Sequence, residues 1–415
     1  MDILHRCCAG LDIHKKTVVA CVRRIDAAGH AHQEIRTFGT MTCDLLALSD
    51  WLAEQGVEHV ALESTGAYWK PVFNILEGRF GVMLVNARHI KQVPGRKTDV
   101  RDCAWIAQLL QHGLLRASFV PPPPIRELRD LTRPRAQLVA EKATAANRVQ
   151  KVLEDANIKL ASVATDVLGV SGRDMPGALI AGEDDAAKLA DKARKRLRNK
   201  IPALQTALRG RVTKHHRFQL RLLLDHVMHL EELIGRLGGR IEEVMAPFAE
   251  AVERLTTIPG VQRRAAETVI AEIGPNMEQF PTADHLASWA GMCPGNNESA
   301  GKRRTGRTRR GNRWLRQAVV QAGWAAAHTK GTYLGARYRR VCRRRGAKRA
   351  LLAVGHTLLV IVYQVLRRRV AYRELGADYY DRLQPERLTR HLVRRLEQLG
   401  HKVTLEEPTG AALTE

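Results

Sequence analysis

The sequence predicts an α/β domain in its first third, followed by two mostly helical regions. Three observations carry this prediction. Residues 1–120 alternate between strand-like and helix-like patterns, four consecutive prolines follow at 121–124, and the chain is almost wholly helix-like from residue 126 to about 255. We therefore expect an α/β domain at 1–120, a long-helix coiled-coil region at 121–255 and a mostly helical domain at 256–415.

The elements of the first region follow one another in a defined order. The predicted strands are 6–14, 16–24, 33–40, 58–65 and 80–87, and the predicted helices are 43–55, 68–77 and one that begins at Asp99. Three strands in a meander, followed by strand–helix units, is the order expected of the ribonuclease H fold. In such a sheet the first and fourth strands lie side by side.

Four acidic residues stand at the ends of these elements. Asp12 ends the first strand and Glu63 ends the fourth, while Asp99 and Asp102 lie three residues apart at the head of the last helix. If that helix packs on the same sheet, the four carboxylates converge. The alternative is that Asp99 caps the helix, with Asp102 as its neighbour, and that Asp12 and Glu63 are ordinary strand ends.

Convergence of four carboxylates is unfavourable without a cation, because like charges at short range raise one another's pKa. Hard divalent cations prefer oxygen ligands, and two such ions can activate an attacking oxygen and stabilise a leaving oxygen in phosphodiester chemistry. The pattern therefore predicts a site for Mg²⁺ or Mn²⁺ with Asp12, Glu63, Asp99 and Asp102 as ligands.

The central region carries one long apolar stripe at spacings of three and four residues. Its members are Leu220, Leu223, Val227, Leu230, Ile234, Leu237, Ile241, Val244, Phe248, Val252 and Leu255. Such a helix needs a partner, either another helix of the same chain or a second copy. The narrow stripe and its charged flanks favour a coiled-coil dimer, although Gly235, Gly238 and Gly239 argue against an unbroken rod. A kink is expected at Pro134.

A further helical pair is expected after Thr257. The stretch "IPGVQRRAAETVIAEIG" has a Pro-Gly turn before a helix and a glycine after it. This pattern is typical of a helix-hairpin-helix unit, whose turn amides contact phosphates, and equally of a plain helical hairpin.

The charge of the chain points to a polyanionic partner. The formal net charge is +24, yet residues 1–120 contribute only 14 basic against 12 acidic side chains. Residues 300–370 hold 20 basic residues and no Asp or Glu. Ordinary surfaces mix both signs, so phosphates are the expected counter-ions.

A membrane is not expected as the partner. No run of 18 apolar residues occurs, the first residues lack a signal-peptide pattern, and 350–366 reads as a buried helix. The seven cysteines form no CxxC pair or zinc-type cluster, which predicts reduced thiols and a cytoplasmic protein.

A second candidate site lies in the loop "GMCPGNNESAGKRRTGRTRRGNRWLR". Ser299, one of only seven serines, precedes a dense group of cations able to hold a phosphate. The interpretation of Ser299 as a nucleophile competes with that of a plain turn residue. The predicted nucleic-acid-binding residues are Lys97, Lys302, Arg303, Arg304, Arg307, Arg309, Arg310 and Arg313.

Several motifs together resemble a known family. They are "GLDIHKKT", "LESTGAYWKP", "NARHIKQVPGRKTDVRDCAWIAQLL", "QKVLEDANIKL", "IPGV" and the Ser299 loop. The combination resembles the transposases of insertion-sequence family one-ten, also called DEDD transposases, which are related to the Piv DNA invertase. The likeness covers nearly the whole chain.

The resemblance implies a RuvC-like, ribonuclease H-type domain in which Asp12, Glu63, Asp99 and Asp102 bind Mg²⁺, and a carboxy-terminal transposase domain in which Ser299 is the nucleophile. It also implies a recombinase that excises and inserts its own element through a phosphoserine link. Dimers or tetramers would form composite sites, and a structured bridge RNA would pair with donor and target DNA.

Two other functions remain open from the residues alone. A RuvC-like Holliday-junction resolvase or nuclease would use the four carboxylates with water as nucleophile. A non-enzymatic nucleic-acid-binding protein would use only the basic residues, its acids being caps and strand ends.

Overall fold

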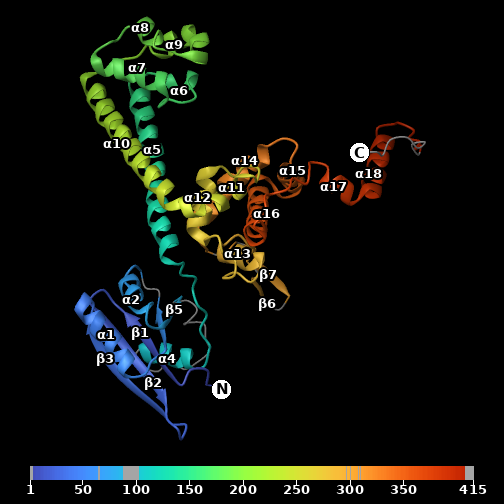
Figure 1. Cartoon of the computed structure of the whole chain (residues 1–415). Coiled ribbons are helices and arrows are strands. Elements are labelled where there is room, and N and C mark those ends of the chain that lie inside the picture. Colours follow the sequence, from blue (N-terminus) through green and yellow to red (C-terminus); the bar gives the residue numbers. More distant parts are fainter. Residues whose placement is uncertain are drawn as a thin grey trace. The chain divides into compact units, whose positions relative to one another are not determined.

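The computed structural model describes residues 3–63, 66–86, 102–295, 297–299, 301–306, 308 and 310–406 (Figure 1). The chain divides into two compact units, Met1–Val120 and Pro121–Glu415. Each unit is described by itself below.

The first unit is built on a five-stranded mixed sheet. Its strands are β1 (Cys7–Ile13), β2 (Thr17–Ile25), β3 (Ala31–Gly39), β4 (His59–Glu63) and β5 (Gly81–Val85). The order across the sheet is β3-β2-β1-β4-β5. The first three strands form an antiparallel meander, and β4 and β5 add parallel to β1. The strands and helices therefore occur in the predicted order, and the sheet is consistent with a ribonuclease H-like domain.

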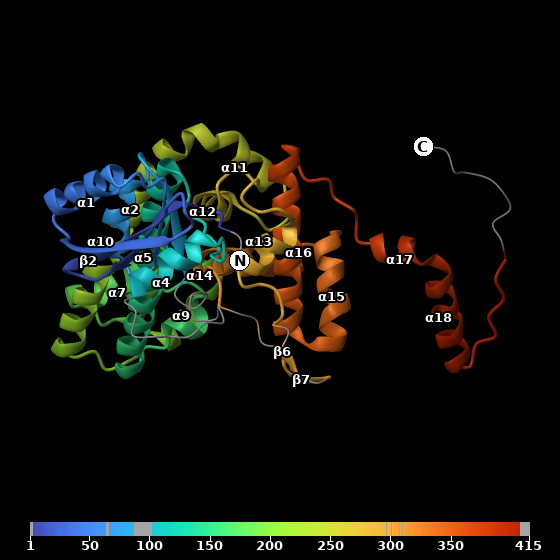
Figure 2. The same ribbon diagram turned by 90° about the horizontal axis from the view of Figure 1, so that it is seen from below.

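Helices cover both faces of this sheet (Figure 2). They are α1 (Thr42–Glu54), α2 (Trp69–Leu76) and α4 (Asp102–Gln111). Alternate residues of β1, such as Leu11, pack with α1 and α2 in one apolar core, while Cys8 packs with α4 in another. This alternation is the period of two expected for a strand buried on both sides.

The second unit begins with two long helices. They are α5 (Pro123–Asp155) and α10 (Lys214–Met245). Arg240 pairs with Glu127 and His216 pairs with Asp155, so the two helices run antiparallel along their length. The prolines at 123 and 124 form the first turn of α5, where the missing amide proton costs nothing. The helix also continues through Pro134, where a kink was expected.

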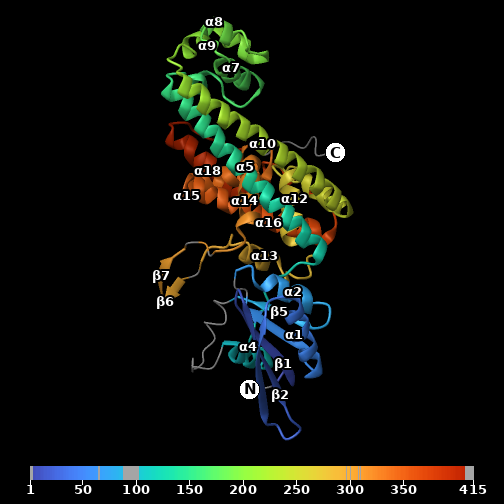
Figure 3. The same cartoon turned by 90° about the vertical axis from the view of Figure 1, so that its left-hand side faces the viewer.

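A cap of short helices joins the far ends of the two long helices (Figure 3). Its elements are α6 (Leu160–Val163), α7 (Val170–Ala181), α8 (Ala186–Ala190), the 3₁₀ helix η1 (Lys195–Lys200) and α9 (Ile201–Ala207). Leu160, Met175 and Leu204 form its core together with Leu153 of α5 and Leu220 of α10.

The predicted coiled-coil dimer is not confirmed, because the apolar stripe of α10 packs within the chain. Val227 and Leu230 are buried with Ala145 of α5, and Leu220 is buried with Val149 of the same helix. The structure thus shows the intramolecular packing, and dimerisation through this region stays a prediction. The stripe is also not one rod, since the 3₁₀ helix η2 (Ala246–Phe248) and the separate helix α11 (Ala249–Thr256) follow Met245.

The remainder of the second unit is a helical body that carries a small β hairpin. Its elements are α12 (Arg263–Ile273), α13 (Ala283–Trp289), β6 (Asn297–Ser299), β7 (Lys302–Thr305), α14 (Arg313–His328), α15 (Tyr333–Arg345), α16 (Ala347–Arg368), α17 (Tyr379–Leu383) and α18 (Pro385–Gln398). By length and composition alone α16 could cross a membrane, but nine of its residues are buried in this body. The predicted buried helix at 350–366 is confirmed.

Candidate functional site

The parallel pairing of β1 and β4 places two of the predicted acids next to each other. Leu11 is the register partner of Leu62, so Asp12 and Glu63 occupy the next position on each strand. Side chains at equivalent positions of neighbouring parallel strands project from the same face. Because Leu11 and Leu62 pack toward α1 and α2, Asp12 and Glu63 belong to the opposite face, which α4 covers.

A glycine allows α4 to lie directly on this face. A Cβ atom on Gly10 would lie 2.3 Å from both the Ala107 amide nitrogen and the Cys103 carbonyl oxygen of α4. The helix backbone therefore crosses β1 two residues before Asp12. Asp102 is the first residue of α4, immediately before Cys103, so it begins the helix on the face of Asp12 and Glu63.

Asp12 contacts a residue that was not predicted from the sequence, His14. Its Oδ2 atom lies 3.2 Å from Nε2 of His14, and the Asp12 side chain is 20% exposed. Residues two apart on a strand share a face, so the alternation of the strand was the signal for this pair. His14 is 60% exposed, so this contact lies on the solvent side of the carboxylate.

The structure describes three of the four predicted metal ligands. Asp99 and Lys97 lie outside the described residues. Among the residues that are described, no group of three His, Cys, Asp or Glu side chains lies close enough to hold a metal ion. The structure thus brings Asp12, Glu63 and Asp102 to one face of the sheet without closing them around a cation. Their carboxylate oxygens are the donors that a hard divalent ion prefers.

The second predicted site lies on the β6–β7 hairpin. In its antiparallel register the backbone of Ser299 is opposite Lys302, and Gly301 makes the turn with φ +73°. The side chains of Ser299, Arg303 and Arg304 lie outside the described part, as do Arg307 and Arg309 entirely. Lys302 and Arg310 are exposed. Arg313 begins α14, with its guanidinium carbon 4.3 Å from the centre of the Trp314 ring.

Close backbone contacts fix the base of this hairpin. A Cβ atom on Gly311 would lie 2.2 Å from the amide nitrogen of Gly291, so only glycine fits there. The Asn312 amide donates a hydrogen bond to the Trp289 carbonyl at 3.3 Å. The chain entering the hairpin and the chain leaving it are therefore held together where α13 ends and α14 begins.

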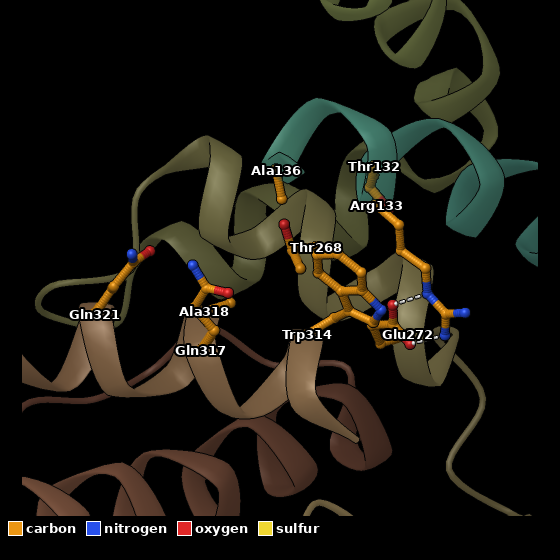
Figure 4. A pocket seen from close by; sticks show the side chains of 9 residues that line it. All are labelled: Thr132, Arg133, Ala136, Thr268, Glu272, Trp314, Gln317, Ala318 and Gln321. Carbon is orange, nitrogen blue, oxygen red and sulfur yellow. Dashed lines mark hydrogen bonds and ion pairs between the residues drawn. The ribbon is translucent and has the colours of Figure 1, made fainter. Parts of the chain in front are cut away.

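A buried carboxylate connects this base to the long helix α5 (Figure 4). Glu272 of α12 is fully buried and accepts two hydrogen bonds of 2.8 Å from Arg133. It also accepts one of 2.6 Å from Nδ2 of Asn312, whose Oδ1 caps the first turn of α14. Nε of Arg129 lies 3.5 Å from Glu272, and burial lowers the pKa of this arginine to about 10.

This network gives the helical body a rigid frame beneath the hairpin. A pocket beside it is lined by Thr132, Arg133, Ala136, Thr268, Glu272, Trp314, Gln317, Ala318 and Gln321. Glu272 was not among the residues predicted from the sequence. The signal was an acid between Val269, Ile270 and Ile273 on the buried side of a helix, which requires a buried basic partner.

The predicted helix-hairpin-helix pattern forms a helical hairpin made of α11 and α12. Gly260 in its turn has φ +84°, and a Cβ atom there would lie 2.4 Å from the Ala322 carbonyl of α14. The turn is thus packed on α14. Contact of its amides with phosphates stays a prediction.

Two family models match this chain, one near its beginning and one in its second half, and both are described as transposases. A family model described as a transposase, of the DEDD type of IS110, matches residues 9–158. A second model, described as the transposase IS116/IS110/IS902 family, matches residues 252–339.

Three relatives are insertion-element proteins. The transposase for insertion sequence element IS1111A of Coxiella burnetii is 23% identical over 70% of this chain and 72% of its own length. The IS900 uncharacterized 42 kDa protein of Mycobacterium paratuberculosis is 27% identical over 88% of this chain and 96% of its own length. The IS110 uncharacterized 43.6 kDa protein of Streptomyces coelicolor is 31% identical over 28% of this chain and 29% of its own length.

Proposed function

Because this chain belongs to the IS110 family of transposases, a family of DNA-cleaving and DNA-joining enzymes, we propose that it excises and inserts its own insertion sequence by attack of Ser299 on DNA. The proposed metal-assisted cleavage is supported by the face of the sheet that Asp12, Glu63 and the start of α4 share. The proposed attack on DNA is supported by the position of Ser299 beside many basic residues in the sequence.

The acidic residues are proposed to hold the divalent ions typical of DEDD transposases. Asp12, Glu63, Asp99 and Asp102 would be the ligands of Mg²⁺ or Mn²⁺. When bound, such ions supply charge stabilisation for phosphodiester cleavage. The chain's own part is to present carboxylate oxygens from two strands and one helix, and His14 would orient Asp12 among them.

The covalent step is proposed to take place on the β6–β7 hairpin. The Ser299 oxygen forms a bond to the scissile phosphorus and gives up its proton, while one bond from phosphorus to a deoxyribose oxygen breaks and that oxygen takes up a proton. The phosphoserine ester conserves the bond energy, so a strand hydroxyl can later attack it and release the serine. Basic residues close to Ser299 in the sequence would neutralise the DNA phosphates. They are Lys302, Arg310 and Arg313, with Arg303, Arg304, Arg307, Arg309 and Lys97 as further candidates.

The partners of this reaction are proposed from the family likeness. Donor and target DNA would be the substrates, and an element-encoded bridge RNA would pair with both. Homodimers or homotetramers would combine the acidic unit of one subunit with the serine domain of another, with residues 121–255 as the dimerisation region and 256–415 as the transposase domain. The place of action would be the bacterial cytoplasm, on DNA.

The decisive experiment is the detection of a covalent protein–DNA adduct. Ser299→Ala should abolish the adduct while leaving DNA binding unchanged, and the matched variant Ser288→Ala, an exposed serine of α13, should retain it. An undiminished adduct in Ser299→Ala would remove this serine from the mechanism. Free 5′-phosphate ends without an adduct would favour a resolvase or nuclease, and DNA that stays intact with metal present would favour a binding protein.

A further inference from the structure

The cap at the tip of the α5–α10 hairpin carries a concentration of positive charge that the proposed active site does not use. Between Lys192 and Arg217 the chain has ten Lys or Arg residues and no Asp or Glu. Nine of these cations are exposed. Of the nine, Arg194 pairs with Asp174 and Lys200 donates a hydrogen bond to the Val163 carbonyl. The other seven are Lys192, Lys195, Arg196, Arg198, Arg209, Arg211 and Lys214.

Acidic residues of the cap do not neutralise these seven cations. Arg194 pairs with Asp174 at 2.8 Å and Arg217 pairs with Asp184 at 2.7 Å. In the described part of the chain, no carboxylate forms an ion pair with any of the seven. The cap therefore presents like charges that repel one another until a polyanion neutralises them.

The fold collects these cations around one short helix. Four of the seven lie on or beside η1, which runs directly into α9, and Arg209 and Arg211 follow the end of that helix. The end is fixed, because the Arg211 amide donates to the Ala156 carbonyl at 2.8 Å and a Cβ on Gly210 would lie 2.4 Å from the same oxygen. A helix of seven residues is about 10 Å long, and a duplex presents roughly six phosphate charges over that length.

The side chains at the tip identify the kind of partner. The cap residues 156–213 contain no Phe, Trp or Tyr on which a base could stack, and the exposed Phe218 lies outside the cap, on α10. Among the described cap residues, Val170 is the one exposed large apolar side chain, so the cap lacks the group of apolar side chains that enters a membrane interface. Exposed Lys and Arg without aromatic residues are suited to contact phosphates and not bases.

The position of the tip defines which part of a nucleic acid it would reach. Arg133 lies where α5 contacts α12, and Asp155 lies where α5 meets the cap. The rise along α5 between them is about 33 Å, which is close to one helical turn of duplex DNA, about 34 Å. The tip thus stands about one duplex turn from the frame that supports the β6–β7 hairpin.

We propose that the cap formed by residues 156–213 is a backbone-binding surface for duplex nucleic acid, which holds phosphates regardless of sequence, about one duplex turn along α5 from the Arg133–Glu272 contact. This inference rests on charge and exposure. It does not depend on chemistry at Asp12 or Ser299, so its failure and that of the proposed reaction are distinguishable.

The test compares two variants of the full-length protein that lose the same charge. The tip variant is K195Q/R196Q/R198Q/R209Q, and the control variant is R387Q/R390Q/R394Q/R395Q on the exposed helix α18. Binding of a 40-base-pair duplex DNA and of a 40-base-pair duplex RNA, both of arbitrary sequence, is measured by fluorescence anisotropy between 50 and 200 mM salt. Thermal unfolding of each variant checks that the fold is retained.

The tip variant should bind at least about tenfold more weakly. The slope of log K against log salt should become smaller in magnitude by about 3.6, since each of the four lost phosphate contacts removes about 0.9. Loss for DNA alone or for RNA alone identifies which nucleic acid the cap holds. The proposal is overturned if the tip variant keeps the wild-type slope for both. It is also overturned if the control variant loses as much, because bulk charge then explains the binding.

Discussion

The contact between Gly10 and α4 makes the geometry of the acidic face directly testable. In Gly10→Ala the new methyl group would meet the Ala107 nitrogen and the Cys103 oxygen at 2.3 Å, and the Ala107 Cα at 2.9 Å. Ordinary contacts begin near 3.4 Å, so the two backbones must separate by about 1 Å. Neither backbone can turn aside as a flexible side chain would.

Two effects follow from this separation. Overpacking of this kind costs about 1–3 kcal/mol, and we expect the upper end because α4 is also held by the buried Ile106 and Leu109. Since α4 carries Asp102, a displacement of about 1 Å should also lower the rate of DNA cleavage by roughly 10²-fold.

The assay measures thermal unfolding and, well below the unfolding temperature, the rate of adduct formation on DNA. Gly78→Ala is the matched control, since a Cβ there meets nothing within 4 Å. Wild-type stability in Gly10→Ala would show that α4 does not cross β1 in this way. Lowered stability with a wild-type rate would show that the acidic face is not the site of chemistry.

Three further predictions concern the second unit. Glu272→Gln should lower the free energy of unfolding by about 3 kcal/mol, because Arg129 and Arg133 lose the fully buried carboxylate with which they pair, and urea titration measures the loss. A hydrogen bond from Arg173 lowers the pKa of Glu231 from 4.5 to about 2. The ionised carboxylate therefore stabilises the fold above pH 4.5, and this stabilisation is lost as the pH falls toward 2. The unfolding temperature of Glu231→Gln should vary less over this pH range than that of the wild type. Gly239→Ala should raise the free energy of unfolding by about 0.5–1 kcal/mol, because this glycine lies within α10 and its added methyl meets nothing within 4 Å; an unchanged unfolding temperature would contradict the assignment of an open helical position.

The sheet and the relation of Asp12 to Glu63 were predictable because each depends on local pattern and on a simple rule. Alternating apolar residues define the strands, and equivalent positions on adjacent parallel strands share a face. A helix was also predicted here from its apolar spacing, beginning at Asp99, and the structure describes it as α4 from Asp102 on. How closely α4 approaches β1 was not, because only the three-dimensional structure shows that Gly10 lies beneath Cys103 and Ala107.

The partner of the α10 stripe could not be predicted from the stripe itself. A row of apolar residues indicates that one face of a helix is buried, but it does not indicate which segment buries it. The residues that cover it, Ala145, Val149 and Leu153, lie on α5 about 70–80 positions earlier in the chain and have a similar spacing. The stripe can pack within its own chain only if the chain reverses direction between α5 and α10. The cap, with its core around Leu160, Met175 and Leu204, makes this reversal.

The β6–β7 hairpin shows how a proposed nucleophile can be positioned by residues that are far from it in sequence. Two strands of three and four residues cannot stabilise themselves in water. The direction of the hairpin is therefore set at its base, where Gly311 contacts Gly291 and where Asn312 joins the cap of α14 to Glu272. Since Glu272 is held in turn by Arg133, loss of that carboxylate should slow adduct formation even under conditions in which the variant is folded. This dependence would separate a supporting frame from a merely stabilising core.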